Sequence, residues 1–456
     1  MTSELLVDAR LGLLTGVVDQ PVSPGMPSGW LGRSARVARA DRFTWWRADG
    51  FGFGATLGDP RRARAAAIGE AVERYCGNAV PADLPPASWE TLVARGVDAV
   101  DPDDLALYSD RQYATPGFPF VRFTRALEVA WVPGIDLAIG GQVLVPASLA
   151  YLDYFHGPHR AEPPTHALMY SGIAAGTSRA AAETAALEEL FERDATTIWW
   201  ASGAPARTVL DDGRVTGQLG RPDPDRPLTV RLLAVPSELG VPVLAAFLAD
   251  EAAGLVAFGS ACRADPSAAA VKALVEALQL LTLTRQLATP DSDVWRAVSA
   301  GDIEDHVFLP FRPDRRYGAA VSEDYSELVD LPAVAQLYLD PDVQRGALGR
   351  LTPDSTVRLD DLPRTDATSL AVTRAAYLAR LHARGLRAVS VDLTTPDIAR
   401  TGLHVVRVVV PGLVGNGPPA YPLRGGRRLY DVPAVLGWTS GPLTEDDLVR
   451  HPLPLA

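Results

Sequence analysis

Several motifs and residue types on which common protein classes depend are rare or missing in this chain. It has one lysine, Lys272, and that lysine follows Val271 rather than a glycine. A Walker A loop, in which a glycine precedes the phosphate-binding lysine, is therefore excluded. The absence of H-R-D and D-F-G triplets argues against a protein kinase, and no G-x-S-x-G motif indicates a serine hydrolase.

Cysteines, long apolar runs and net positive charge are also lacking. The two cysteines, Cys76 and Cys262, form no disulfide framework and suit a reducing cytoplasm, where we expect the protein to be. The start of the chain lacks a signal peptide's apolar run, and no stretch of about 20 uninterrupted apolar residues occurs, so we expect no membrane partner. The net charge of −12 argues against a nucleic-acid partner. His156, His159 and His166 lie in a proline-rich loop without cysteines, which favours an ordinary loop over a zinc site.

The composition is that of a folded globular protein, with 47% hydrophobic and 21% charged residues. Apolar runs typical of strands, such as 230–235 and 404–410, alternate with helical patterns such as 370–384. We therefore predict an α/β (α+β) fold with a sizeable sheet, in a single domain that spans 1–456. The polar, Asp- and Pro-rich residues 288–350 are predicted to form a mobile, variable insertion, and 411–456 a C-terminal segment with a proline-containing tail.

The most informative stretch is 170–200, where a strand end, a glycine turn and a helix follow one another. Thr177 or Ser178 can cap this helix, because a hydroxyl accepts from the open N–H groups of the first turn. Glu189 and Glu192 are three residues apart, so both carboxylates leave one face of the helix. Such acids are costly to bury alone but suit Mg²⁺, which prefers carboxylate oxygen. A single E-x-x-E-R pattern, however, more often marks a solvated helix face.

The same arrangement of strand, glycine turn, capped helix and an E-x-x-E or E-x-x-Q pattern occurs three times. Besides 170–200 it occurs at 51–77 and 257–281, where Asp-Pro pairs precede the helices as cap and first helical residue. Chance is a poor explanation for three copies in register, so we predict that the three helices converge on one cation-rich site. The residues in register are Glu70 and Glu73, Glu189 and Glu192, and Glu276 and Gln279.

Four motifs, taken in order, resemble the YcaO superfamily. They are F-G-A-T-L-G-D-P…G-E-A-V-E-R-Y, S-G-I-A-A-G-T…L-E-E-L-F-E-R-D-A, A-L-V-E-A-L-Q, and V-D-L-T-T-P-D…V-V-R-V-V-V-P-G-L. The resemblance covers about residues 5–290 and 365–456 and implies a YcaO-like fold with the repeated units around a nucleotide site. Family members bind ATP and Mg²⁺ without a P-loop. Many phosphorylate a backbone amide oxygen of a ribosomally made precursor peptide, after a Cys, Ser or Thr side chain has attacked the carbonyl.

The resemblance also implies roles for individual residues. Mg²⁺ would be held by Glu70, Glu73, Glu189 and Glu192. The nucleotide would be bound by the same four glutamates together with Arg74, Ser171, Arg193, Glu276 and Gln279. Catalytic roles would fall to Arg193, Arg407, Pro452 and Pro454. This assignment is physically reasonable, because Mg²⁺ and arginine offset the charge that develops as ATP turns a poor leaving group into phosphate.

Within the family, the resemblance favours an ATP-dependent cyclodehydratase that forms a thiazoline or oxazoline. Azoline-forming members tend to end in a proline-rich tail, and Pro452 and Pro454 match part of that pattern. The chain starts almost at once with the family's own region, so we expect a separate protein to bind the leader of the precursor peptide. A flavin-dependent azoline dehydrogenase is a further expected partner, in a homodimer or hetero-complex.

Departures from the family pattern leave two alternatives open. Ala66 stands where a serine is usual, and Ala181 where a carboxylate is usual, with Glu183 displaced on the same helix. Each departure removes a potential nucleotide contact. One alternative is therefore a catalytically weakened scaffold or regulatory subunit of a modification complex. The other is a thioamidase or amidine-forming enzyme, which shares the activation step but uses another nucleophile.

Overall fold

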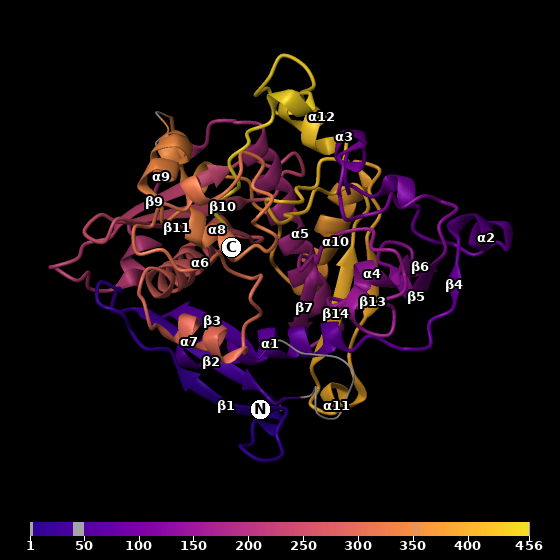
Figure 1. The fold of residues 1–456 in the computed structure, drawn as a ribbon, viewed down its shortest axis with the longest axis horizontal. Coiled ribbons are helices and arrows are strands. Elements are labelled where there is room, and N and C mark those ends of the chain that lie inside the picture. Colours follow the sequence, from indigo (N-terminus) through magenta and orange to yellow (C-terminus); the bar gives the residue numbers. More distant parts are fainter. Residues whose placement is uncertain (1–2, 40–49, 352, 354, 456) are drawn as a thin grey trace.

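The strands form three separate sheets in the computed structural model, which describes residues 3–39, 50–351, 353 and 355–455 (Figure 1). The first sheet is antiparallel and comprises β1 (Leu14–Asp19), β2 (Trp30–Val37) and β3 (Phe51–Leu57). The second has the order β11 (Leu255–Cys262), β10 (Val243–Asp250), β9 (Thr229–Val235), β8 (Arg207–Leu210) and β12 (Thr356–Arg358). The third has the order β4 (Pro86–Ala87), β5 (Val129–Asp136), β13 (Val389–Asp392), β14 (His404–Val409) and β7 (Ile173–Gly176), with β6 (Gln142–Pro146) paired to β5.

Three long helices follow three of these strands, as the repeat predicts. They are α1 (Pro60–Asn78) after β3, α5 (Arg179–Ala201) after β7 and α6 (Pro266–Leu287) after β11. Asp59 caps α1 by accepting from Arg62 N at 3.0 Å, and Asp265 caps α6 by accepting from Ser267 N at 2.9 Å. Ser178, one of the two predicted hydroxyls, caps α5 by accepting from Ala181 N at 3.2 Å. The predicted helix starts are therefore confirmed.

Each long helix packs against its own strand and against the strand of another repeat. Helix α1 contacts β3 and β7, α5 contacts β7 and β11, and α6 contacts β11 and β3, so the three units close into a ring (Figure 1). The helices approach the strands closely because the strands carry glycine. A Cβ on Gly54 would lie 2.2 Å from Ala67 N, and one on Gly259 would lie 2.3 Å from Ala277 N. The ring therefore depends on the glycines of the repeated motif.

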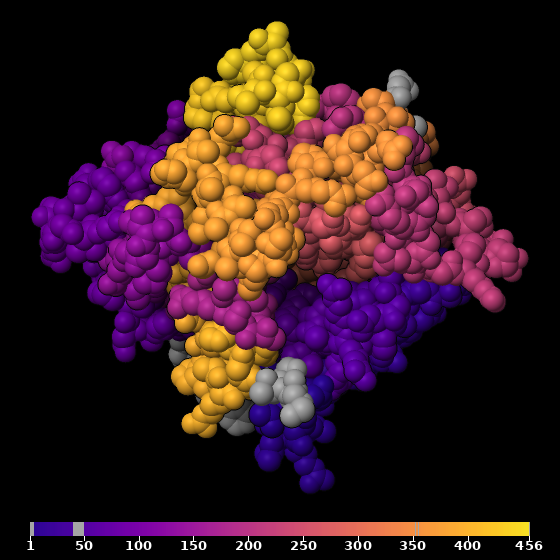
Figure 2. Space-filling model, turned by 180° about the vertical axis from the view of Figure 1, so that it is seen from behind, coloured from indigo at the N-terminus to yellow at the C-terminus, as the bar shows by residue number. Residues whose placement is uncertain are grey.

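The shorter helices surround this ring. They are α2 (Trp89–Ala94), α3 (Asp110–Tyr113), α4 (Ala147–Ala150), α7 (Asp293–Ala300), α8 (Ala333–Leu337), α9 (Pro341–Leu348), α10 (Leu370–His382), α11 (Pro396–Ala399) and α12 (Arg428–Val435). Helices α10 and α12 both pack against α5. Seen from behind, the orange region that includes α10 lies between the indigo N-terminal region and the yellow C-terminal segment (Figure 2).

The segment 288–350 is built into the protein. Residues 333–340 are all buried, and α8 packs against α6. The buried Gln336 side chain bonds both backbone groups of Leu309, accepting from its N–H at 2.7 Å and donating to its carbonyl at 2.8 Å. Through α8, the segment therefore shares the core of α6.

The C-terminal tail also enters the core, and Figure 1 places its end beside α8. Leu453 and Leu455 are 8% and 6% exposed and belong to the hydrophobic cluster that contains Trp199 and Trp200 of α5. Trp200 Nε1 donates to the carbonyl of His451 at 2.7 Å. The tail is therefore held by side chains and by backbone hydrogen bonds; Ala456 lies outside the described residues.

Among the described residues, α6 is the one helix whose length and apolar composition would allow it to cross a membrane, and 56% of its apolar window is buried inside the protein. This burial follows from the position of α6 in the ring, where it packs against β11 and β3.

Candidate active site

The first repeat holds two glutamates on the inner face of α1. Glu70 accepts from the backbone N–H of Phe53 on β3 at 3.2 Å, and its other oxygen lies 3.7 Å from Arg74 Nη2. Glu73 accepts from the backbone N–H of Ala175 at 2.7 Å. Ala175 belongs to β7, the strand of the second repeat. The two acids of one helix are therefore fixed by two different repeats.

The second repeat reproduces this arrangement on α5. Glu189 accepts from the backbone N–H of Gly172 at 3.0 Å and lies 3.7 Å from Arg193, the same separation as between Glu70 and Arg74. Glu192 accepts from the hydroxyl of Ser260, on the strand of the third repeat, at 2.7 Å. The sequence repeat is thus a repeat of geometry, in which the first acid is held near its own strand and the second by the next unit.

The third repeat differs, because its first acid is paired with the only lysine of the chain. Lys272 lies one turn before Glu276 and forms an ion pair with it. In the aligned repeats this position is occupied by Ala66 and Ala185. Gln279, in place of a second acid, is half-buried on the same helix. Lys272 is not among the candidate site residues of the sequence analysis, although its position four residues before Glu276 in the repeat could have identified it.

The five glutamates act on one another through their charges and form one electrostatic cluster, here called the acid ring (Glu70, Glu73, Glu189, Glu192 and Glu276). Burial raises the pKa of Glu73 to about 8, with further contributions from the charges of Glu70 and Glu189. Burial likewise raises the pKa of Glu192, and the charges of Glu189 and Glu276 add to the rise. The pKa of Glu70 is raised by burial and by Glu276, which closes the ring. The structure therefore brings all five predicted acids together.

Basic side chains are interleaved with the acid ring. Burial alone would raise the pKa of Glu276, but the positive charges of Lys272, Arg193 and Arg263 outweigh it and hold that pKa below its usual value. Arg193 also lies 3.1 Å from Glu192. Arg263 is held by Glu188, a buried acid of α5 that the sequence analysis did not single out, at 3.2 Å. The site therefore offers oxygen ligands for a cation and guanidinium and ammonium groups for phosphate.

The donor set of the acid ring fits Mg²⁺ in its chemistry. Its carboxylates are hard oxygen ligands, and burial with mutual repulsion raises the pKa of three of them, a penalty that a divalent cation relieves. Within the described part of the chain, no three acidic, histidine or cysteine side chains are already placed as a group that could hold a metal ion. The carboxylates instead accept hydrogen bonds from backbone N–H groups and from the hydroxyl of Ser260.

The other residues singled out by sequence occupy different surroundings. Arg407 on β14 is 4% exposed and donates to the carbonyls of Tyr170 and Met169. Ser171 follows Tyr170 directly and precedes Gly172, whose N–H binds Glu189. Pro452 and Pro454 lie in the tail, where Tyr338 donates to the carbonyl of Pro452 at 2.6 Å. The tail meets α5 at Trp199 and Trp200, about two helical turns beyond Glu192.

The departures at Ala66 and Ala181 are not compensated by Glu183. That side chain is buried and accepts from Arg179 at 3.2 Å and from Arg374, so it belongs to an ion-pair network at the start of α5.

 Glu183 therefore stabilises the entry to α5 and does not take the place of the missing carboxylate.

The histidines of the 155–166 loop have structural roles. His159 stacks on Tyr154 with ring centroids 4.7 Å apart, and its ring nitrogens lie 2.9 Å from Glu162 and 2.8 Å from the carbonyl of Pro81. His166 is buried, with its ring nitrogens bonded to the carbonyl of Ala167 and to the hydroxyl of Ser148. These contacts agree with the ordinary loop that the sequence favours over a zinc site.

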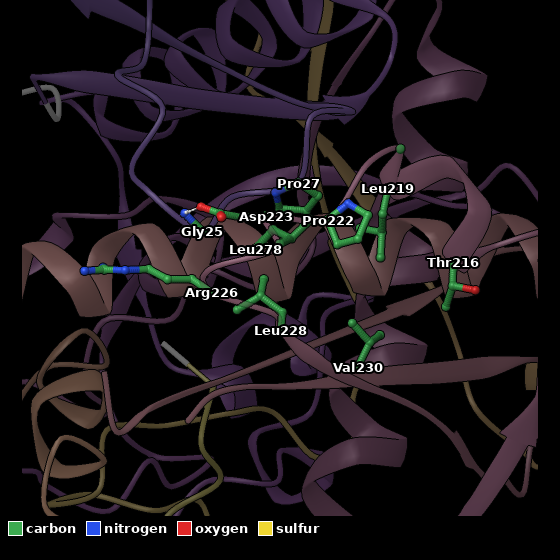
Figure 3. Close-up of a pocket in the computed structure, with 11 residues that line it drawn as sticks. Gly25, Pro27, Thr216, Leu219, Pro222, Asp223, Arg226, Leu228, Val230 and Leu278 are labelled. Carbon is green, nitrogen blue, oxygen red and sulfur yellow. Dashed lines mark hydrogen bonds between the residues drawn. The ribbon is translucent and has the colours of Figure 1, made fainter. Parts of the chain in front are cut away.

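A separate apolar pocket of about 200 Å³ lies on another face of α6 (Figure 3). Leu278 forms part of its wall, and it follows Glu276 by two residues, so the two side chains leave opposite sides of the helix. Leu219, Leu228 and Val230 complete the apolar lining, and Asp223 accepts from Gly25 N at 3.0 Å. This pocket is therefore distinct from the acid ring.

Comparison with known families gives a match over most of the chain. Residues 52–414 match the family model described as YcaO cyclodehydratase, ATP- and Mg²⁺-binding. An uncharacterised protein of Rhizobium leguminosarum bv. trifolii, from the region 3′ of tfuA, is 27% identical over 243 residues, which are 48% of this chain and 52% of that protein. An uncharacterised protein of Methanothermobacter thermautotrophicus is 28% identical over 368 residues, which are 77% of this chain and 79% of that protein.

Solved structures share the fold at low sequence identity. A heterocyclase in complex with substrate and cofactor has a TM-score of 0.67 and 22% identity, covering 99% of this chain and 56% of its own. The YcaO protein of Methanopyrus kandleri bound with AMPPCP and Mg²⁺ has a TM-score of 0.57 and 22% identity, covering 91% of this chain and 92% of its own. The chain thus spans about half the length of the Rhizobium protein and of the heterocyclase. These structural likenesses confirm the predicted fold class, and the family model confirms the family resemblance.

Proposed function

Because the chain belongs to the YcaO cyclodehydratase family, whose domain binds ATP and Mg²⁺, we propose that it uses ATP to activate a backbone amide of a ribosomally made precursor peptide. The observation that carries this proposal is the acid ring with its interleaved basic side chains. Carboxylates alone would suit a cation, and basic groups alone would suit an anion. Their alternation over three helices suits the magnesium salt of a nucleotide, which presents both charges.

The residues of the two matching repeats divide this task. Glu70, Glu73, Glu189 and Glu192 hold Mg²⁺, since their oxygens line the inner faces of α1 and α5. Arg74 and Arg193 lie beside these glutamates and would neutralise phosphate charge, and Arg193 would also act in catalysis. Ser171, Glu276 and Gln279 complete the nucleotide site, and Lys272 joins them as a further phosphate contact. When bound, Mg²⁺-ATP supplies the phosphoryl group that turns the amide oxygen into a leaving group.

The proposed product is a thiazoline or oxazoline. In this reaction a Cys, Ser or Thr side chain of the peptide would lose its proton and attack the preceding carbonyl carbon. The carbonyl oxygen would take the γ-phosphoryl group of ATP as ADP leaves, and phosphate would then leave as the nitrogen loses its proton. This product is proposed because a heterocyclase, 22% identical, is among the structural neighbours, and a thioamide or an amidine would need the same activation step. A protein that binds the leader peptide, and a flavin-dependent azoline dehydrogenase, are the proposed partners in a homodimer or hetero-complex. The McbBCD synthetase complex of E. coli, with a TM-score of 0.52 and 12% identity, offers a precedent for such assembly.

A scaffold or regulatory subunit is the second candidate function. The observation in its favour is the pair Ala66 and Ala181, because each lacks a polar group where the family usually has one. The two candidates differ in nucleotide binding, since a scaffold with a lost site would bind none. The same measurement therefore separates them.

The test is calorimetric titration of Mg²⁺ and a non-hydrolysable ATP analogue into the wild-type chain and into Glu189→Gln and Glu192→Gln. Glu4→Gln is a matched control, because Glu4 pairs with Arg64 of α1 at 2.8 Å, outside the acid ring. Saturable binding by the wild type and the control that is lost in both ring variants supports the enzyme. No binding by the folded wild-type chain, with its partner protein present, would favour the scaffold.

The product is tested by mass spectrometry of a precursor peptide after incubation with the chain, its partner and ATP. Loss of one water from a peptide with a Cys, Ser or Thr acceptor supports the azoline. Exchange of an oxygen atom for sulfur, in the presence of a sulfide source, would instead identify a thioamidase.

A further inference from the structure

A short segment, residues 169–172, joins the two matching repeats at the acid ring. The guanidinium carbon of Arg74 lies 4.2 Å from the centroid of the Tyr170 ring, so this ring supports the arginine of the first repeat. Two residues further, the backbone N–H of Gly172 donates to Glu189 of the second repeat at 3.0 Å. The position of this segment therefore affects a basic group on α1 and an acid on α5 together.

Arg407, on β14, holds this segment through its guanidinium group. Its Nη1 donates to the carbonyl of Tyr170 at 3.0 Å and its Nη2 to the carbonyl of Met169 at 2.9 Å. The next residue on β14, Val408, donates its N–H to the carbonyl of Gly172 at 2.7 Å. Gly172 has a φ of +92°, and a Cβ there would lie 2.6 Å from the carbonyl of Val408. The segment is thus tied to β14 at both of its ends and has little freedom to move.

The surroundings of Arg407 suit an internal support rather than a ligand contact. The residue is 4% exposed, and its Nε is buried without a hydrogen-bond partner among the described residues. Burial lowers the pKa of Arg407 to about 10, which leaves it charged at neutral pH, and the nearby charge of Glu189 opposes that lowering. Neighbouring His166 is neutral, because burial and, to a smaller extent, the charge of Arg407 lower its pKa to about 4. Two backbone carbonyls therefore accept hydrogen bonds from the two terminal nitrogens of this buried guanidinium.

We propose that Arg407 is a positioning residue, which fixes residues 169–172 and thereby sets the orientation of Arg74 and Glu189 toward Mg²⁺ and nucleotide without touching either. This inference rests on the proposed function and replaces the catalytic role that the family resemblance implies for Arg407. Lysine cannot substitute for it, because a single ammonium group does not reproduce the planar fork that reaches two carbonyls. The role follows from contacts of the chain with itself.

The test compares Arg407→Lys, Tyr170→Leu and the double variant in calorimetric binding of Mg²⁺ and a non-hydrolysable ATP analogue. Residues that orient ligands typically change affinity by about 10–100-fold, and we expect a loss of this size in each single variant. Because both substitutions act through one segment, the double variant should lose less than the product of the two single losses. Arg387→Lys is the matched control, since Arg387 forks onto Asp98 and Asp136 at the edge of the same sheet, and its affinity should match the wild type.

The outcomes separate this proposal from its alternatives. If Arg407→Lys binds the analogue as the wild type does but modifies peptide more slowly, Arg407 touches the substrate and the proposal is wrong. Independent, multiplicative losses in the double variant would refute the connection through Tyr170. The Tyr170→Leu variant keeps the buried arginine, so it tests the same path even if Arg407→Lys folds poorly. Absence of binding by the wild-type chain itself would overturn the proposed function, and this inference with it.

Discussion

Shortening Leu453 to alanine should detach the C-terminal tail from the core and lower the free energy of unfolding. Leu453 is 8% exposed and packs in the cluster that contains Trp199 and Trp200 of α5. Leucine-to-alanine changes in such positions cost about 2–5 kcal/mol, because apolar contacts are lost and a cavity remains. A typical domain has a stability of about 5–15 kcal/mol, so a change of this size is readily measured.

A point substitution tests the tail more clearly than a deletion. Removing residues 452–455 would also remove the entropic cost of ordering them, which is about 1–2 kcal/mol for each of the four residues. This gain opposes the loss of packing. The two effects are of similar size, so a truncated chain with an unchanged melting temperature would say little about the contacts. Leu453→Ala keeps the chain length and removes only the side chain.

The assay is urea unfolding followed by tryptophan fluorescence, with Leu455→Ala as a second buried variant and Leu11→Ala as an exposed control. Leu455 is 6% exposed and Leu11 is 93% exposed. We expect a lower unfolding midpoint for both buried variants and a change of less than about 0.5 kcal/mol for the control. Wild-type stability in Leu453→Ala and Leu455→Ala together would refute the conclusion that the tail is part of the core.

Three further predictions concern the acid ring. Glu192→Gln should abolish ATP-dependent peptide modification, measured by mass spectrometry, because it removes a proposed Mg²⁺ ligand; unchanged turnover would contradict the site. Ser260→Ala should weaken Mg²⁺ binding by about 10–100-fold in calorimetry, since the hydroxyl that holds Glu192 is lost, and Ser260→Thr should restore it. Lys272, the only lysine, should be protected from acetylation by Mg²⁺ and the ATP analogue, as followed by peptide mass mapping; equal labelling with and without nucleotide would exclude the contact.

The local features of this protein could be predicted from its sequence. The helix starts were predictable because an Asp-Pro pair or a hydroxyl before an alanine-rich stretch satisfies the first N–H groups of a helix. The placement of Glu70 with Glu73, and of Glu189 with Glu192, on single helix faces follows from the helical period. Repetition of these features, which needs no structure to detect, then indicated that the acids belong to one site. Each of these features involves only a few neighbouring residues or a comparison of one repeat with another.

The contacts that hold each group in that site depend on the tertiary structure. Glu73 is fixed by the N–H of Ala175, 102 residues away, and Glu192 by the hydroxyl of Ser260, 68 residues away. Neither contact leaves a pattern in the chain, because a backbone N–H is common to nearly all residues and a serine hydroxyl is frequent. The burial of Arg407 and Leu453 likewise depends on strands and helices that meet only when the three repeats close into a ring. Local periodicity therefore specified the acids, and the closed ring of helices and strands determined their partners.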